Sequence, residues 1–228
     1  MNKHDAAVVF DLDGTLVDSV YQHVMAWHEA LRKSNIELSI WRIHRRIGMS
    51  GGLLVRALAR ELGYELDAAT LERLQRDHEA AYRERSKTVV PLPGAIELLA
   101  TLSREGVAWA IATSAARRFT ESSLAALNVP DGVPVVTHDE VAHAKPNPDL
   151  FLAAARALDV PTEQTFVVGD SLWDILAARR AGTLGVGLLS GGYGHAELVE
   201  SGAYRVYEDP ADLLANLHEL GLRVPRDP

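Results

Sequence analysis

Two aspartates close a short apolar run near the start of the chain. Val8–Phe10 is followed by Asp11, Leu12, Asp13 and Gly14. Because side chains alternate along an extended chain, Asp11 and Asp13 can project to the same side, and Gly14 lets the backbone turn after them. One carboxylate can be an ionised nucleophile or metal ligand while the other transfers a proton. An isolated Asp-x-Asp-Gly more often only ends a strand and begins a turn, so the rest of the chain must distinguish these interpretations.

Later segments place further polar residues after apolar runs that predict buried strands. These residues are Thr113 and Ser114 after the run 107–112, Lys145 in the loop after 133–136, and Asp170 and Asp174 after 165–168. Because the carboxyl ends of parallel strands lie along one edge of a sheet, they can converge with the first two aspartates. Acids, a hydroxyl and a lysine are the groups needed for phosphoryl transfer through an aspartyl-phosphate, and carboxylate oxygens favour Mg²⁺.

Each of these later residues also has a purely structural interpretation. Thr113 and Ser114 are residue types that cap the first backbone N–H groups of a helix. Lys145, which precedes a proline, is by itself most simply a solvated loop lysine. Asp174 lies in the first turns of a predicted helix, where the helix dipole favours an acid. That last role is compatible with metal binding.

Strands that alternate with helices are expected to position these side chains. Strand-like runs occupy residues 8–10, 107–112, 133–136, 165–168, 184–189 and about 204–206, and helical periodicity spans 96–102, 116–127, 149–158, 174–181 and 210–220. This alternation predicts an α/β fold with a parallel sheet that helices cover on both faces.

Residues 19–87 show helical periodicity and no convincing strand pattern. The first helix of this block repeats apolar residues at steps of three and four, so Trp27 is interpreted as a core residue. Further helices are expected at about 39–47, 53–62 and 67–86, with Ser19 or Asp18 and Ser39 as candidate N-caps. The sequence therefore predicts a helical insertion at 18–87 that interrupts an α/β core formed by 1–17 and 88–228.

The composition excludes several classes of function. The chain has 228 residues, 47% of them hydrophobic, which suits a globular protein with a sizeable core. The absence of cysteine excludes disulfides, thiolate metal sites and thiol catalysis. A net charge of −8 argues against nucleic acid or an anionic membrane as partner. Met1–Asp5 leads directly into the first strand, with no stretch that suits a signal peptide or membrane span, so a cytoplasmic protein is expected.

Four segments together resemble the four ordered motifs of the haloacid dehalogenase superfamily. They are Asp11-Leu12-Asp13-Gly14-Thr15-Leu16, Thr113, Lys145-Pro146 and Gly169-Asp170-Ser171-Leu172-Trp173-Asp174. The match spans nearly the whole predicted core, and four motifs in order are far more specific than any one alone. The insertion after the first motif resembles the helical cap of the branch that contains phosphoglycolate phosphatase and β-phosphoglucomutase. The resemblance implies a Rossmann-like parallel sheet with an inserted all-helical cap domain.

The resemblance also implies roles for the matching acidic residues. Asp11 would attack phosphorus, and Asp13 would protonate the leaving oxygen and then take a proton from the hydrolytic water. Asp11, Asp170 and the Asp13 backbone carbonyl would bind Mg²⁺, with Asp174 holding the metal site directly or through a water. Dehalogenases of this superfamily lack the second aspartate, because a halide leaves without a proton, so Asp13 indicates a phosphate ester.

The remaining motif residues are implied to bind the transferring phosphoryl group. Thr113 and the backbone amide of Ser114 would bind its oxygens, and Lys145 would neutralise its charge.

The cap is expected to select the substrate, and its sequence is less informative. His23 stands where β-phosphoglucomutase carries a histidine, and it lies near the acidic loop. Ile47 and Gly51 occupy positions where the mutase has basic residues, which argues against mutase activity. His23, Arg46 and Arg117 are the candidate substrate-binding residues. His44 and Arg45, like the two arginines, are candidate contacts for a substrate carboxylate or second anionic group. Each of these four taken singly is more simply a solvated surface charge.

The function predicted is a Mg²⁺-dependent phosphatase that hydrolyses a small phosphate monoester, of the phosphoglycolate or sugar phosphate class, through an aspartyl-phosphate. Two alternatives stay open at this point. One is a phosphomutase similar to β-phosphoglucomutase, and the other is a non-catalytic ligand-binding or regulatory protein with the same fold. The expected partner is a small phosphorylated metabolite, and the expected state is a monomer or homodimer.

Overall fold

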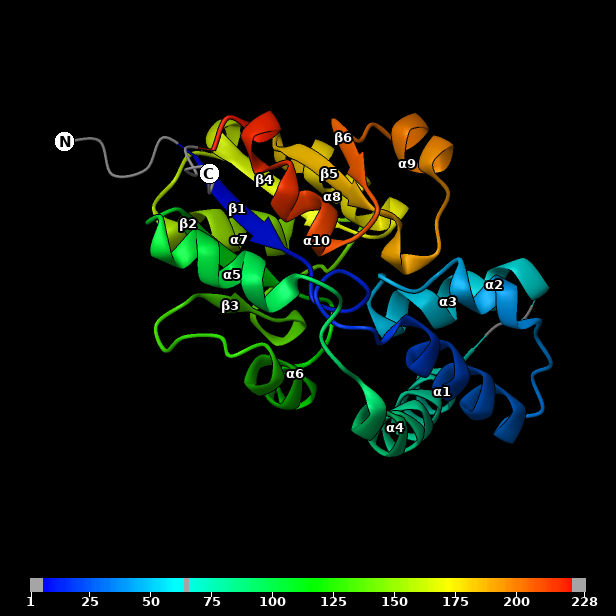
Figure 1. Ribbon diagram of the computed structural model, residues 1–228. Coiled ribbons are helices and arrows are strands. Elements are labelled where there is room, and N and C mark those ends of the chain that lie inside the picture. Colours follow the sequence, from blue (N-terminus) through cyan, green and yellow to red (C-terminus); the bar gives the residue numbers. More distant parts are fainter. Residues whose placement is uncertain (1–5, 64–65, 223–228) are drawn as a thin grey trace.

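A six-stranded parallel sheet lies at the centre of the computed structural model, which describes residues 6–63 and 66–222 (Figure 1). Its strands are β1 (Ala7–Phe10), β2 (Ala108–Ala112), β3 (Val135–Val136), β4 (Thr165–Gly169), β5 (Leu184–Leu188) and β6 (Arg205–Tyr207). Their order in the sheet is β3-β2-β1-β4-β5-β6, and every pair is parallel. This is the strand order of doubly wound Rossmann sheets. The segment Met1–Asp5, which was expected to lead into β1, lies outside the described residues.

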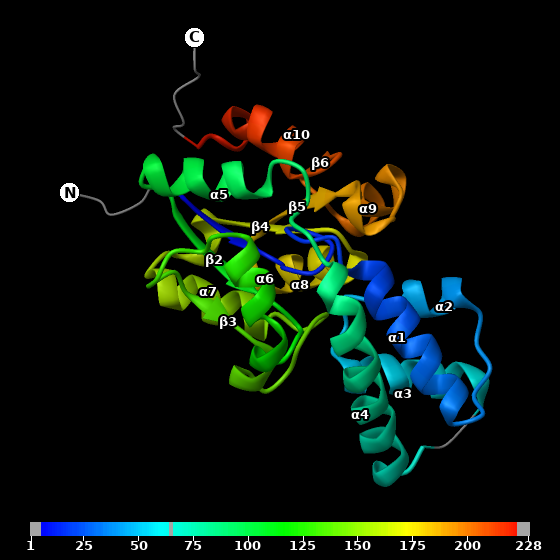
Figure 2. The same cartoon turned by 60° about the horizontal axis from the view of Figure 1, so that its bottom comes forward.

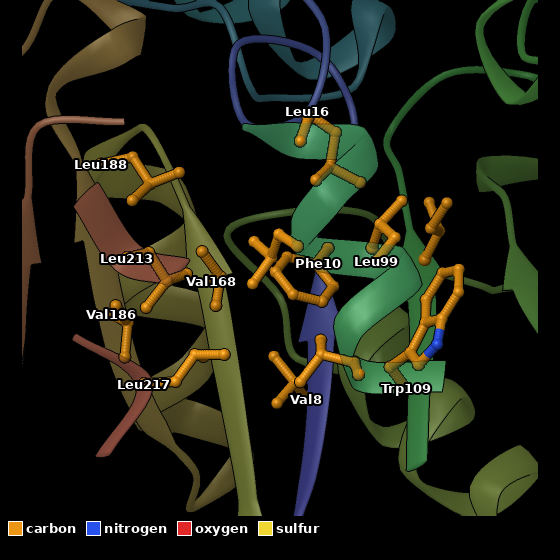
Figure 3. Packing of buried hydrophobic residues seen from close by; sticks show 14 of the residues in the cluster. Val8, Phe10, Leu16, Leu99, Trp109, Val168, Val186, Leu188, Leu213 and Leu217 are labelled. Carbon is orange, nitrogen blue, oxygen red and sulfur yellow. The ribbon is translucent and has the colours of Figure 1, made fainter. Parts of the chain in front are cut away.

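Both faces of the sheet are apolar because helices cover both. Val8 and Phe10 of β1 pack in one cluster (Figure 3), and Val9 packs in another, as the alternation of a strand requires. The first face is covered by α5 (Ala95–Arg104) and α10 (Pro210–Ala215), and the second by α7 (Asp149–Leu158) and α8 (Leu172–Ala181) (Figure 2). This double coverage explains why β1 is a continuous apolar run.

Four helices follow β1 and form the helical cap at one end of the sheet (Figure 1). They are α1 (Val20–Lys33), α2 (Ile40–His44), α3 (Gly51–Leu62) and α4 (Ala68–Arg85). Their inner faces share one hydrophobic cluster, which includes Val24, Leu58 and Leu74. The predicted fold class, a parallel sheet core with an inserted all-helical cap, is confirmed. The assignment of residues 18–87 to a separate domain stays a prediction.

Three predicted helices differ in extent from the observed ones. The helix expected at 116–127 is a 3₁₀ turn, η2 (Arg117–Phe119), followed by α6 (Glu121–Ala126). The Thr120 hydroxyl donates to the Arg117 carbonyl at 2.8 Å, a local bond that competes with a continuous helix. Similarly, α10 gives way to the turn Leu217–Leu220, and α2 ends at His44 instead of near residue 47. Edge strand β6 is flanked by α9 (His195–Ser201).

Within the described ranges, no helix is both long enough and apolar enough to cross a bilayer.

The packing of α5 on the sheet predicts a large stability effect for Leu98→Ala. Leu98 is fully buried in the cluster on the first face of the sheet. Truncation should lower the free energy of unfolding by about 2–5 kcal/mol, because it removes apolar contacts and leaves a cavity. Urea denaturation checks this, with Val199→Ala on the exposed face of α9 as the control, expected within about 0.5 kcal/mol of wild type. A similar small effect of both substitutions would contradict the packing described.

Candidate active site

Three buried aspartates meet at the carboxyl edge of the sheet. Asp11 follows β1, Asp170 follows β4, and Asp174 lies in the first turn of α8. One carboxylate oxygen from each lies within 4.8 Å of the others, although the residues are far apart in sequence. The two central strands are neighbours, so their ends bring these side chains together. Hard oxygen ligands in this arrangement fit a divalent cation such as Mg²⁺.

Lys145 lies beneath this cluster in the loop between β3 and α7 and is fully buried. Its Nζ is 2.5 Å from Asp11 Oδ1 and 2.8 Å from Asp174 Oδ1. A buried ammonium is stable only beside such compensating charges. The interpretation of Lys145 as a solvated loop residue is therefore wrong.

The single positive charge of Lys145 does not compensate the three buried carboxyl groups of Asp11, Asp170 and Asp174. Burial raises the pKa of Asp11 to about 7, although Lys145 opposes the rise. Burial, together with the nearby Asp174 and Asp11, raises the pKa of Asp170 well above its ordinary value. Three acids facing one ammonium thus favour the entry of a further cation.

Asp13 has a different environment, at the boundary between the core and the cap. Burial alone would raise its pKa, but His23 and the Ser19 hydroxyl lower it below its ordinary value. Ser19 Oγ donates to Asp13 Oδ1 at 2.6 Å, and His23 Nε2 lies 3.4 Å from the same oxygen. Ser19 stands at the N-cap position of α1, yet its hydroxyl makes no capping bond because it binds Asp13.

His78 of α4 was not identified from the sequence, and the structure places it beside His23. His23 Nδ1 and His78 Nε2 are 3.3 Å apart, and the planes of the two imidazoles are nearly parallel, at 17° to one another. Tyr82 stacks on His23 at 3.8 Å and Trp27 stacks on His78 at 4.1 Å, measured between ring centroids. Burial and the neighbouring His23 lower the pKa of His78 well below its ordinary value. His78 lies four residues from both Leu74 and Tyr82, which are buried on the inner face of α4. This helical spacing was the signal in the sequence that could have identified it.

Asp11 and Asp13 line a cavity of about 260 Å³ between the core and the cap, whereas Asp170, Asp174 and Lys145 lie behind its wall. Of the predicted site residues, Asp11, Asp13, His23, Thr113 and Ser114 line it. Trp27, interpreted as a core residue, packs in the cap cluster and also contributes to the wall. Ser114 Oγ donates to the Gly48 carbonyl at 3.0 Å, which joins the segment after β2 in the core to the cap.

Two predicted substrate residues do not reach this cavity. Arg46 pairs with Glu61 of α3, and Arg117 pairs with Glu140 and donates to the Val135 carbonyl. Neither arginine is among the described residues that line the cavity, whereas Arg118 is.

Gly191 shows how closely the site is packed behind Asp170. A Cβ at Gly191 would lie 1.8 Å from Asp170 Oδ2, so only glycine fits against this carboxylate. His44, expected as a possible substrate contact, instead lies with Nε2 2.8 Å from the Gly191 carbonyl. The glycine therefore joins the cap to the cluster of aspartates.

Comparison with known proteins identifies relatives across most of the chain. The family model for haloacid dehalogenase-like hydrolases matches residues 6–182. A phosphoglycolate phosphatase from Rhodospirillum rubrum is 35% identical over 216 residues, covering 91% of this chain and 88% of that protein. N-acetylmuramic acid 6-phosphate phosphatase from Pseudomonas aeruginosa is 32% identical over 180 residues, covering 78% of each chain. The crystal structure of a hydrolase from Pseudomonas syringae superposes with a TM-score of 0.92 at 51% identity, covering 94% of this chain and 98% of that one.

The position of Lys145 predicts a pH-dependent loss of stability in Lys145→Met. With a chelator present, the free energy of unfolding should fall by about 3–5 kcal/mol at pH 8.5, because two buried carboxylates lose their counter-ion. When folding raises the pKa of a carboxyl group, the free energy of unfolding falls as the pH rises up to the pKa of that group in the folded protein. This pKa is about 7 for Asp11 in the wild type. Without Lys145 this pKa rises further, so the variant keeps losing stability above pH 7, where the wild-type loss has ended.

Urea denaturation at pH 5.5 and pH 8.5 measures the difference between the two proteins. Lys87→Met, which removes an exposed lysine paired with Glu84, is the control and should change little at either pH. An equal loss for Lys145→Met at both pH values would contradict the described charge pairing.

Proposed function

Since this chain belongs to the haloacid dehalogenase-like hydrolase family and is a phosphatase, we propose that it hydrolyses a small phosphate monoester with Mg²⁺, through an aspartyl-phosphate on Asp11. One observation carries the proposal. Asp11 lies in a buried cluster of acids with a buried lysine, and Asp11 and Asp13 both line a small cavity.

Two displacements at phosphorus complete the reaction. A carboxylate oxygen of Asp11 attacks the phosphoryl group, and the ester oxygen leaves with a proton from Asp13. Because His23 and Ser19 lower the pKa of Asp13 and keep it ionised before binding, this proton enters with the substrate as its phosphate monoanion and passes through Asp13. Asp13, now a carboxylate, takes a proton from water, whose oxygen attacks the phosphorus of phospho-Asp11. The acyl phosphate P–O bond breaks, which releases inorganic phosphate and restores the Asp11 carboxylate. Ser19 and His23 hold the Asp13 side chain at the cavity wall during both steps.

The buried acids would hold the metal ion. Asp11, Asp170 and the backbone carbonyl of Asp13 are the proposed ligands, with Asp174 supporting the site directly or through a water. When bound, Mg²⁺ supplies positive charge that reduces repulsion between the Asp11 carboxylate and the phosphoryl oxygens. Lys145 contributes a second positive charge next to Asp11.

The phosphoryl oxygens are bound by the segment after β2. The Thr113 hydroxyl and the Ser114 backbone amide are the proposed donors, and both residues line the cavity. In the structure, Thr113 Oγ1 accepts from the Ala115 amide at 3.0 Å, which holds its donor proton free for another partner. A cavity of about 260 Å³ suits a small metabolite, since pockets for drug-sized ligands span roughly 300–1,000 Å³.

Phosphate release from a panel of small phosphate esters tests this function. The wild-type enzyme should release phosphate with Mg²⁺ and not with a chelator, and Asp11→Asn should lose at least about a thousandfold in kcat, as expected when a nucleophile is removed. The variant should keep the wild-type circular dichroism spectrum, because the amide is nearly isosteric with the carboxyl. Wild-type turnover by Asp11→Asn, or turnover unaffected by the chelator, would refute the proposal.

The packing behind Asp170 predicts an effect of Gly191→Ala on metal affinity. The added methyl must displace the Asp170 carboxylate, so the Mg²⁺ concentration for half-maximal activity should rise by about 10–100-fold, as for other disturbed ligand supports. Gly194→Ala in the same loop is the control, since its Cβ meets only the Glu197 carboxylate at 3.4 Å. Equal Mg²⁺ dependence of both variants would contradict the role of Asp170 as a ligand.

A further inference from the structure

The cavity wall beyond the aspartates carries little positive charge. Among the described wall residues, Arg118 is the single lysine or arginine, and it reaches from the core to pair with Glu79 of α4 in the cap. Both members of this pair line the cavity. The guanidinium charge is therefore already neutralised on the side where a substrate would sit.

A second acid makes this part of the wall net negative. Asp139 also lines the cavity, and its Oδ2 accepts from the Arg117 backbone amide at 2.8 Å. The Arg117 guanidinium does not offset Asp139, because it pairs with Glu140. Glu79, Asp139 and Arg118 thus sum to one negative charge, and His23, His78 and His138 are the titratable histidines among the described residues of the wall. His78 adds no positive charge, since burial holds its pKa well below the ordinary value.

The rest of the wall offers apolar surface and neutral polar groups. Ile47, Met49, Leu54 and Phe119 supply apolar side chains, and Gln75 supplies an amide. A carboxylate or second phosphate placed among these groups would lose water without gaining a cationic partner, which costs far more than burying a hydroxyl that finds a hydrogen bond. It would also be repelled by Glu79 and Asp139.

We propose that this cavity selects phosphate monoesters of uncharged, hydroxylated alcohols and rejects esters with a second anionic group. Glu79 imposes the selection, because it both neutralises Arg118 and places its own carboxylate on the wall. This inference rests on the proposed phosphatase activity and specifies the class of its substrate.

Matched pairs of esters separate charge from size in the test. 2-Hydroxyethyl phosphate carries a terminal alcohol at the position where 2-phosphoglycolate carries a carboxylate. Glucose 6-phosphate and 6-phosphogluconate make the same comparison at the size of a hexose. In the wild-type enzyme, kcat/KM should favour the uncharged member of each pair by about tenfold or more.

Glu79→Gln keeps the shape of the side chain and removes its charge. The ratio of kcat/KM between the uncharged and the anionic ester should fall by about tenfold, mainly because the anionic ester improves when Arg118 becomes free to pair with it. Glu72→Gln is the matched control: Glu72 lies on the same helix, is exposed, pairs with Arg76 and does not line the cavity. This variant should keep the wild-type ratio.

The outcomes separate the two proposals. If the wild-type enzyme hydrolyses both esters of a pair and prefers the anionic one, the inference about substrate charge is wrong and the phosphatase proposal stands. Such a preference would mean that Arg118 leaves Glu79 to bind the substrate. An unchanged ratio in Glu79→Gln would equally overturn the role of Glu79. Phosphate release no greater than that of Asp11→Asn with all four esters, and across the wider panel, would refute the phosphatase proposal and the inference with it.

Discussion

The contact of Lys145 with Asp11 and Asp174 is the interaction on which the site depends. Three acids share one buried edge, and without the ammonium between two of them their desolvation and mutual repulsion would be too costly. The parallel sheet makes this contact possible, because β1 and β4 are neighbours and end at the same edge. Burial, with the repulsion between neighbouring acids, raises the pKa of Asp11 and Asp170. A divalent cation would relieve both effects.

The position of the cap in the chain explains how the cap and the core share one site. Asp13 is followed within a few residues by α1, so Ser19 and His23 from the start of that helix reach back to the Asp13 carboxylate. His78 from α4 then contacts His23, which extends this set of contacts into the cap. Movement of the cap would therefore alter the surroundings of Asp13 directly, while Asp11 stays enclosed by the core.

Chemistry and selectivity have separate physical origins in this molecule. The aspartate edge rests on strand ends and a buried ion pair, which give it fixed geometry and charge. The opposite wall is formed by side chains of α1, α3, α4 and η2, whose identity can change without disturbing the sheet. The two phosphatases compared above are named for different esters, and the Glu79–Arg118 ion pair lies on this wall.

The sequence by itself determined the α/β alternation, the helical insertion and the residues that converge at the sheet edge. Apolar periodicity specifies which face of an element is buried, and parallel strands necessarily end together. Tertiary structure decided which neighbouring side chains face the cavity: Arg118 rather than Arg117, and His78, which no motif marked. It also decided that Lys145 is buried. These outcomes depend on the break between η2 and α6 and on contacts between elements that are far apart in the sequence. The local spacing of apolar residues indicates only which face of a regular helix or strand is buried.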